Sequence, residues 1–214
     1  HYRKYGTEGY VLRVDVKKYY NNITMDVALN AIKNIGEKNL KTAETFLRTH
    51  YSQDGFYAGS QAVQVVGVMV LNDLDHYVKE QLRIKHYLRY MDDFIVITET
   101  KDKAVFVLAE IKKELAKIGL SVNEEKTRIV PVSKPIHWLG FTFVLRPTGH
   151  VIMRVDNKSV ADKRRQFRRM AKRFPERINS AYKGYRAHLG KGNCFTQVRN
   201  MDKFIRSING KNHV

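Results

Sequence analysis

The chain has 214 residues, of which 43% are apolar and 11% aromatic, so it can bury a substantial core, which argues against disorder. Its 39 Lys and Arg residues against 21 Asp and Glu leave a formal charge of +18, as expected of a nucleic-acid binder. A basic soluble protein, or one that touches an acidic membrane surface, has the same balance. The single cysteine, Cys194, excludes an intramolecular disulfide and is interpreted as a bystander in a reducing, cytoplasmic compartment.

No targeting or membrane segment is predicted. Residues 1–5 are basic, but no apolar run follows them, so they do not form a signal peptide. The most apolar stretch, Ala62 to Leu71, is about half the length that spans a bilayer. The first residue is His rather than Met, so we expect that a segment upstream belongs to the protein.

In chain order, the first expected element is a strand over residues 10–16, which alternate and are β-branched. Residues 24–50 predict two helices with a break at Gly36. Ser60 is expected to cap a long helix that runs to about Lys85 and is buried at its start.

The middle of the chain predicts a hairpin over residues 87–97 with its turn at 91–93. A helix from about Lys101 to Ile118 should end at Gly119, which is a plausible C-terminal cap. Residues 126–130 predict another strand.

The last third predicts a second hairpin, with one strand over residues 136–145, its turn at 147–149 and the other strand over 150–155. From Asn157 onward the chain is expected to be helical and very basic, except near residues 190–193.

The predicted fold class is α+β, with a small antiparallel sheet packed on helices, because the elements lack the regular rhythm of a parallel sheet. A composition shift near Asp156 predicts two domains, residues 1–156 and a basic, mainly helical segment over residues 157–214.

Two aspartates, Asp92 and Asp93, occupy the turn of the first hairpin. Like charges at this distance repel, and a fold keeps them readily only if a cation shares the site. Asp15 ends another apolar strand, where a lone charge is equally out of place. A hard divalent ion such as Mg²⁺ prefers carboxylate and phosphate oxygens. If the two strands are neighbours, Asp15 and Asp92 can hold two metal ions for an in-line phosphoryl transfer.

The alternative is ordinary turn chemistry, because Asp-Asp is common in hairpin turns and the pattern from Tyr90 to Asp93 is short. The flanking residues favour the catalytic interpretation, since they are Leu88 and the apolar run Phe94 to Ile97. A solvated turn has little reason to be framed by apolar side chains.

Segments along nearly the whole chain resemble reverse transcriptases, the RNA-directed DNA polymerases, and they occur in that family's order. They comprise residues 14–23, 59–64, 72–76, 89–94, 119–127 and 138–141. The loop at residues 59–64 and the tail at residues 180–188 are most similar to bacterial and phage enzymes of the diversity-generating or defence-associated kind.

The resemblance implies a polymerase palm over residues 1–156 and a thumb-like segment after it. Asp15 and Asp92 would then be the catalytic ligands of two Mg²⁺ ions, for which Mn²⁺ can substitute. Val16 is assigned to the same metal site. Asp93 is expected to be a weaker ligand, because successive side chains of a strand alternate in direction.

The same resemblance assigns residues to the incoming nucleotide. The ring of Tyr20 would crowd the sugar 2′-carbon and reject ribonucleotides, and its alternative is a core aromatic beside Tyr19. Gly59, Gln64 and Met91 would contact the nucleotide or the template, although helix capping and packing also explain Gln64.

Lys126 matches a lysine proposed to protonate the departing pyrophosphate, and its alternative is a solvated lysine near Glu124 and Glu125. The primer would be held by Trp138, Leu139 and Gly140. The basic run at residues 163–173 would follow primer or template phosphates through residues that include Arg165 and Arg169, with Phe167 and Met170 pointing inward. A solvated helical face is its alternative.

Two departures from the family pattern change what is expected. Ala58 precedes Gly59 where many relatives carry Pro-Gln-Gly, and Val63 replaces a small polar residue, so nucleotide contacts should differ. The N-terminal fingers segment does not precede Asp15, so either this is an excised fragment or an accessory partner supplies the missing part.

The function expected from the resemblance is RNA-directed DNA synthesis from an RNA template, a DNA or RNA primer and dNTPs, without a membrane partner. One alternative is a protein-primed or untemplated DNA polymerase of a phage-defence system. The other is a non-catalytic scaffold that holds RNA, which the three retained aspartates argue against.

Overall fold

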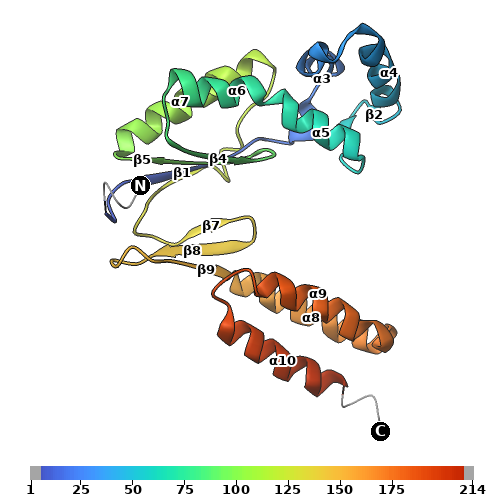
Figure 1. The fold of residues 1–214 in the computed structure, drawn as a ribbon, viewed down its shortest axis with the longest axis vertical. Helices are drawn as coiled ribbons and strands as arrows, with labels where there is room; N and C mark the ends of the chain where they lie inside the picture. Colours follow the sequence, from blue (N-terminus) through green and yellow to red (C-terminus); the bar gives the residue numbers. More distant parts are fainter. Residues whose placement is uncertain (1–5, 210–214) are drawn as a thin grey trace. The chain divides into compact units, whose positions relative to one another are not determined.

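The computed structural model describes residues 6–209, so the basic residues 1–5 lie outside the described part. The described chain forms two compact units, of which the first comprises residues 8–131 and the second contains residues 132–209. Both combine helices with small antiparallel sheets, which confirms the α+β class (Figure 1). The boundary of the units follows Pro131, whereas the composition shift near Asp156 lies inside the second unit, where its sheet ends and its helices begin.

The first unit is built on a four-stranded antiparallel sheet with the order β4-β5-β1-β6. Its strands are β1 (Tyr10–Asp15), β4 (His86–Tyr90), β5 (Asp93–Thr98) and β6 (Arg128–Pro131). The first predicted strand and the predicted hairpin are therefore confirmed, and they are neighbours through the pairing of β1 with β5.

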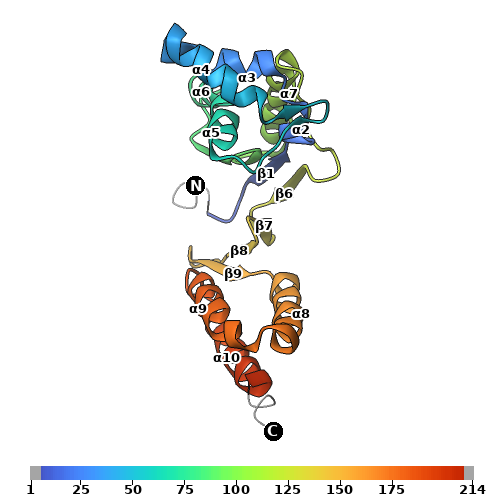
Figure 2. The same ribbon diagram turned by 90° about the vertical axis from the view of Figure 1, so that its right-hand side faces the viewer.

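One face of this sheet is covered by α7 (Lys101–Lys117), as Figures 1 and 2 show. The hydroxyl of Thr100 accepts a hydrogen bond from the backbone of Lys103 at 3.2 Å and caps the helix. Gly119, with φ of 73°, adopts the left-handed conformation that ends it. The facing side chains are fully buried and comprise Leu12, Val14, Phe94 and Val96 of the sheet and Ala104, Val107, Ile111 and Leu115 of the helix.

Between β1 and β4 the chain forms mostly helices. They are α2 (Tyr19–Asn22), α3 (Met25–Ala31), the 3₁₀ turn η1 (Lys33–Ile35), α4 (Glu37–Arg48), α5 (Gln61–Val70), α6 (Asn72–His76) and the π-helical turn η2 (Tyr77–Gln81). A small hairpin of β2 (Tyr51–Ser52) and β3 (Gly55–Phe56) separates α4 from α5. Two helices with a break at Gly36 were expected here and are confirmed.

The single long helix expected from Ser60 to Lys85 is wrong. Leu71 leaves helical geometry, with φ of −99° and ψ of 10°, and a new helix begins at Asn72. Asp73 and Asp75 lie in the first turn of this new helix, where the helix dipole favours negative charge. Ser60 does precede α5, but its hydroxyl makes no capping hydrogen bond within the described chain.

The second unit begins with a three-stranded antiparallel sheet of β7 (Ile136–Trp138), β8 (Phe141–Leu145) and β9 (Val151–Val155). The predicted single strand over residues 136–145 is wrong because it is interrupted by a tight turn. Leu139 and Gly140 have φ of 50° and 78°, a pair of left-handed residues that is typical of a two-residue hairpin turn.

Three helices complete the second unit, α8 (Asn157–Arg173), α9 (Ile178–Leu189) and α10 (Phe195–Asn209), with the 3₁₀ turn η3 (Pro175–Arg177) before α9. Figure 2 shows α8 beside the pair of α9 and α10. Cys194 is buried, and its sulfur accepts a hydrogen bond from the backbone of Val155 at 3.4 Å, so it packs in this core. Among the described residues, no helix is both long and apolar enough to cross a membrane.

Candidate active site

The main chain brings Asp15 and the Asp92–Asp93 turn together. Asp15 and Asp93 are paired Cα partners at the ends of β1 and β5. The next residue, Val16, donates its backbone N–H to the carbonyl oxygen of Asp92 at 3.2 Å. Met91 has φ of 55°, the left-handed conformation that closes the turn between β4 and β5. The neighbouring strands on which a shared carboxylate site depends are therefore present.

A third segment completes this arrangement. Val122 forms a bridge with Val16, and the backbone N–H of Asn123 donates to the carbonyl oxygen of Asp15 at 2.7 Å. These contacts place residues 122–126 against the end of β1. A pocket of about 620 Å³ lies here, lined by residues 15–19, by Asp92 and by residues 122–126. Both aspartates and Lys126 therefore face one cavity of the first unit.

Asp15 is only 8% exposed, and its charge is balanced by Lys126. The Lys126 Nζ lies 3.3 Å from each carboxylate oxygen of Asp15, although the lysine side chain is 61% exposed. Glu124 instead pairs with Lys112 at 2.7 Å. Lys126 is thus a solvent-accessible lysine that is held at the carboxylate of Asp15 rather than at that of Glu124.

Asp93 has a different counter-ion. Its two carboxylate oxygens accept hydrogen bonds from Arg13 Nε and Nη2, each at 3.3 Å. Burial raises the pKa of Asp92, and the charges of Asp15 and Asp93 raise it further, against the lowering effects of its own backbone hydrogen bond and of Lys126. No cationic side chain of the described residues forms an ion pair with Asp92. This carboxylate is therefore the one whose charge a bound cation would relieve most.

The carboxylates of Asp15 and Asp92 suit a divalent ion whose other ligands include phosphate oxygens. Within residues 6–209, no group of three or more His, Cys, Asp or Glu side chains is arranged to hold a metal. Mg²⁺ is usually bound by only one or two carboxylates, with water and substrate phosphates as its other ligands. Asp15 and Asp92 meet this requirement, and Val16 lines the same pocket.

The two neighbouring tyrosines have different environments. Tyr19 is buried, and its hydroxyl donates to the carbonyl oxygen of Gly67, so it is a core residue. Tyr20 is partly exposed, and its hydroxyl lies 3.9 Å from the Met91 sulfur. A side chain at Gly67 would meet the Tyr20 ring. Burial and the charge of Asp92 raise the pKa of Tyr20. The contact of its hydroxyl with Met91 places Tyr20 beside the turn that carries Asp92.

The loop before α5 is held by its own side chains. The Gln64 amide donates to the carbonyl oxygen of Ala58 at 3.0 Å, which is the packing alternative stated for this residue. A Cβ at Gly59 would meet the ring of Tyr57, which is exposed. The loop therefore exposes the ring of Tyr57 close to Gly59, one of the residues expected to contact the nucleotide.

A partly buried network around Arg89 was not predicted from the sequence. Arg89 pairs with Asp75, and its guanidinium also donates to the carbonyl oxygens of Met91 and Val68, both at 3.1 Å. The hydroxyl of Tyr87 donates to Asp75 at 2.6 Å. The Arg89 side chain is only 9% exposed. An arginine between Leu88 and Tyr90, two residues before the turn at Met91, was the available signal for this network.

The second unit carries the residues that were assigned to primer and template. Leu139 and Gly140 form the tip of the β7–β8 turn, and Trp138 ends β7. On α8, Phe167 is buried and Met170 partly buried, as expected of inward anchors. The cations of this helix have different partners. Arg165 pairs with Asp162, and Lys163 lies over the rings of Phe167 and Tyr185. Arg164 and Arg168 lie over the ring of Phe204, whereas Arg169, Lys172 and Arg173 are exposed.

Comparisons with known proteins identify the family and similar folds. Residues 1–143 match the family described as reverse transcriptase (RNA-dependent DNA polymerase). No curated protein is significantly similar in sequence. The fold is similar to that of apo telomerase from Candida tropicalis, truncated from its C-terminal domain, with a TM-score of 0.54 and 17% identity over 72% of this chain and 37% of that one.

A second similar structure is telomerase from Candida albicans in complex with a fragment of telomeric RNA, with a TM-score of 0.54 and 12% identity. The similarity covers 98% of this chain and 46% of that one. At these identities the likeness concerns the fold alone. This chain spans less than half the length of either telomerase chain.

Proposed function

Because the chain belongs to the reverse transcriptase family, we propose that it carries the palm of an RNA-directed DNA polymerase over residues 1–156, followed by a thumb-like segment over residues 157–214. The reaction would transfer dNMP from a dNTP to a primer 3′-hydroxyl on an RNA template. The observation that supports this most directly is the convergence of Asp15, Asp92 and Lys126 on one pocket. The closer likeness to bacterial and phage enzymes stays a prediction.

Asp15 and Asp92, with Val16, would hold two Mg²⁺ ions, and Mn²⁺ can take their place. When bound, such ions favour ionisation of the primer hydroxyl and stabilise charge on the transferred phosphoryl group. Main-chain hydrogen bonds hold the two residues in place, and burial limits the contact of the Asp15 carboxylate with water. Arg13 holds Asp93 in a separate ion pair, which agrees with a lesser role for Asp93.

Substrate contacts follow from the surroundings of these carboxylates. The ring of Tyr20 would stand against the sugar of the incoming dNTP, next to Met91. Gly59 and Gln64 would contact the nucleotide or the template once the amide of Gln64 leaves Ala58. In the second unit, the turn of Trp138, Leu139 and Gly140 would hold the primer, and exposed α8 cations such as Arg165 and Arg169 would bind phosphates.

The test is primer extension on an RNA template by the full-length protein that contains this chain. Asp15→Asn and Asp92→Asn each remove one metal ligand at almost constant volume, and incorporation should fall by at least about 10³-fold. Asp93→Asn should cost less. Asp102→Asn is the matched control, because Asp102 is exposed in the first turn of α7 and follows the end of β5 that is opposite the turn with Asp92.

Circular dichroism and nucleic-acid binding should be unchanged in every variant, so that a loss of incorporation reports on chemistry. Polymerisation by either Asn variant at the wild-type rate would disprove the site. Sequencing of the product separates templated synthesis from the untemplated or protein-primed alternative. A wild-type protein that binds RNA but never extends a primer would be the scaffold.

A further inference from the structure

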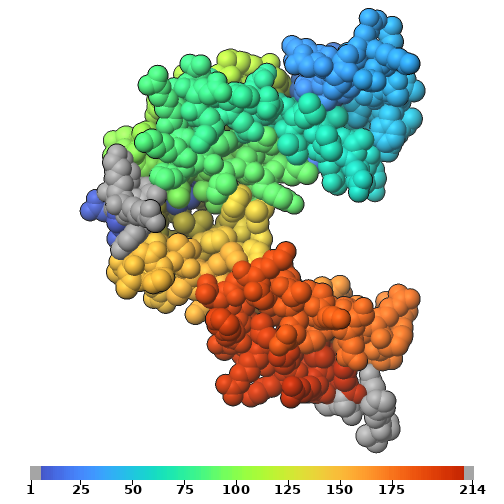
Figure 3. Space-filling model, in the orientation of Figure 1, coloured from blue at the N-terminus to red at the C-terminus, as the bar shows by residue number. Residues whose placement is uncertain are grey.

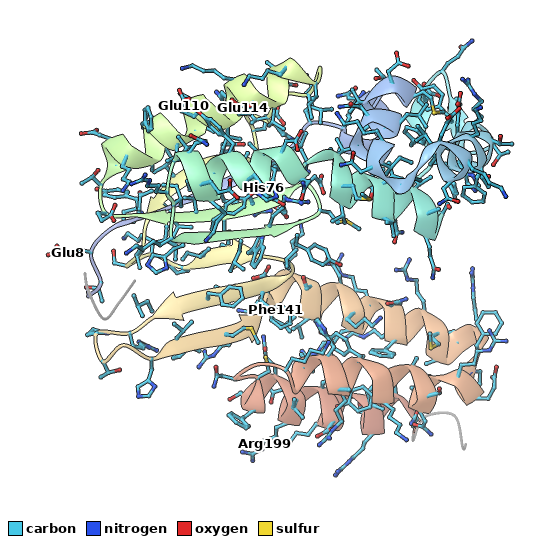
Figure 4. All side chains as sticks on the ribbon, turned by 45° about the horizontal axis from the view of Figure 1, so that its top comes forward. Glu8, His76, Glu110, Glu114, Phe141 and Arg199 are labelled. Carbon is cyan, nitrogen blue, oxygen red and sulfur yellow. The ribbon has the colours of Figure 1, made fainter. Side chains whose placement is uncertain are left out.

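The outer face of α10 combines an exposed aromatic ring with three cations. Phe195 is 81% exposed, the largest exposed fraction among the bulky apolar residues of the described chain. Arg199, Lys203 and Arg206 follow at spacings of four, four and three residues, which keep all of them on the face of Phe195. Figure 4 shows Arg199 on the outer side of this helix, and α10 is red in the space-filling view of Figure 3.

These side chains border a groove of about 370 Å³ on the second unit. Asp202, the one acidic residue that lines it, is already engaged by other partners. It accepts hydrogen bonds from the hydroxyl of Tyr182 at 2.5 Å and from Arg186 at 3.1 Å. Within residues 6–209, Arg199, Lys203 and Arg206 form no ion pair, so the groove keeps a positive charge.

This face is separate from the basic face of α8. Phe204 lies nine residues after Phe195, which is about two and a half helical turns, so the two rings point to opposite sides of α10. Arg164 and Arg168 of α8 lie over the Phe204 ring, at 5.6 and 5.2 Å from its centre. α8 therefore packs on the Phe204 side, and the Phe195 side faces away from it.

The chemistry of this groove fits single-stranded nucleic acid better than other occupants. An exposed ring offers a surface on which any unpaired base can stack, and nearby cations bind the phosphates of the same strand. An apolar protein partner would need further apolar side chains around Phe195, but three of the groove's side chains are cations. An acidic peptide would use the cations and leave the ring without a partner.

We propose that the Phe195 face of α10 is a second nucleic-acid site, which binds an unpaired strand by stacking one base on Phe195 and holding its phosphates on Arg199, Lys203 and Arg206. This site goes beyond polymerisation. It is independent of the carboxylate pocket and of the phosphate contacts proposed for α8.

The experiment measures binding of a fluorescein-labelled oligouridylate and of a blunt duplex by anisotropy, using the full-length protein. Phe195→Ala should weaken binding of the single strand by about 5- to 100-fold, the range for loss of one base–aromatic stack. Duplex binding and primer extension should stay within about twofold. Phe106→Ala, which removes an exposed ring from α7 of the first unit, is the matched control and should bind both ligands normally.

The cations are tested by salt dependence. Arg199→Gln with Lys203→Gln should reduce the slope of log affinity against log salt by about 0.7 for each lost phosphate contact. Lys38→Gln with Lys101→Gln removes the same charge from exposed positions of the first unit and should leave the slope unchanged. Phe195→Trp adds a reporter whose fluorescence should be quenched by the oligouridylate, whereas Phe106→Trp should not be quenched.

Single-strand binding by Phe195→Ala at wild-type affinity would overturn the proposal. So would equal losses of single-strand and duplex binding, or tight binding of polyglutamate that is lost in the α10 double variant but not in Phe195→Ala. None of these outcomes depends on incorporation, so failure here is distinct from failure of the proposed polymerase activity.

Discussion

The ammonium group of Lys126 lies 3.3 Å from both carboxylate oxygens of Asp15, and the two residues come from opposite ends of the first unit's sequence. Main-chain hydrogen bonds from residues 121–123 to the end of β1 create this proximity. The lysine thus serves as the counter-ion of Asp15. If Asp15 binds a divalent ion as proposed, the long, exposed lysine side chain would be free to turn toward a phosphate.

Replacing Lys126 separates these two roles. Lys126→Met and Lys126→Arg should both lower the single-turnover incorporation rate by about 10²- to 10³-fold, because neither side chain can donate a proton as lysine does. Lys126→Met should also bind Mg²⁺ at least as tightly as the wild type, since a competing positive charge is lost. Rapid-quench kinetics and a Mg²⁺ titration measure the two effects. Full activity of Lys126→Arg would instead identify the role as charge alone.

Changing Arg89 should disturb the position of Asp92 rather than the binding of substrate. Arg89→Lys keeps the charge but loses the simultaneous bonds to Asp75 and to the Met91 carbonyl oxygen. If the Asp92 carboxylate moves by about 1 Å in this variant, kcat should fall on the order of 10²-fold, with little change in the nucleotide KM. Asp75→Asn should have a similar effect, and the double variant should lose little more than either alone. Additive losses would show that the two residues act separately.

The size of Tyr20 should govern sugar selection. Tyr20→Ala removes the ring that stands beside Met91 and Gly67, and it should raise incorporation of ribonucleotides relative to deoxynucleotides by at least about tenfold. Tyr19→Phe is the matched control, since it loses only the buried bond to Gly67. This control should cost about 1 kcal/mol of stability and leave selection unchanged. The measurement is the ratio of kcat/KM for UTP and dTTP, and an unchanged ratio in Tyr20→Ala would contradict the assignment.

The second unit should lose stability in acid through Asp202. Hydrogen bonding by Tyr182 and Arg186, together with the charges of Arg186 and Arg206, lowers the pKa of Asp202 below its value of 3.8 in an unfolded chain. Because the folded pKa is the lower one, this carboxylate stabilises the fold above about pH 4, and the contribution disappears as pH falls through the folded pKa. Asp202→Asn should therefore be less stable than the wild type at pH 7, and the difference in the free energy of unfolding should shrink as pH falls below about 4, as measured by urea unfolding. A pH-independent difference would contradict this linkage.

Local patterns predicted the elements that hold the site. The apolar runs on both sides of Asp92 are enough to predict a hairpin, and Asp15 at the end of an apolar strand identifies the partner carboxylate. From the sequence, Asp15 and Asp92 could be expected to lie close together only if their strands were neighbours, because strand order depends on long-range contacts. The pairing of Arg13 with Asp93 and of Arg89 with Asp75 depends on that order, so neither could be predicted.

The errors in the fold also have physical causes. Leu139 adopts φ of 50°, which is sterically unfavourable for leucine, so this residue gives no sign of a turn. Gly140 is the only residue after Trp138 that indicates the turn between β7 and β8. The break at Leu71 lies within an apolar run that is typical of a continuous helix. It is visible only when Asp73 and Asp75 are recognised as residues of a helix start.

Backbone hydrogen bonds join the end of β1 to Asp92 and to residues 121–123, and this long-range pairing affects how the protein folds during its synthesis. A nascent chain that has emerged only as far as β5 already contains Asp15, Asp92 and Asp93 but lacks Asn123 and Lys126. Contacts between residues so far apart in sequence form late, because loop closure must precede them. The acidic cluster should therefore remain without its lysine counter-charge until the strand after α7 has been made. Ribosome-bound chains from which residue 126 has emerged should differ sharply in protease resistance at the hairpin from chains in which it has not.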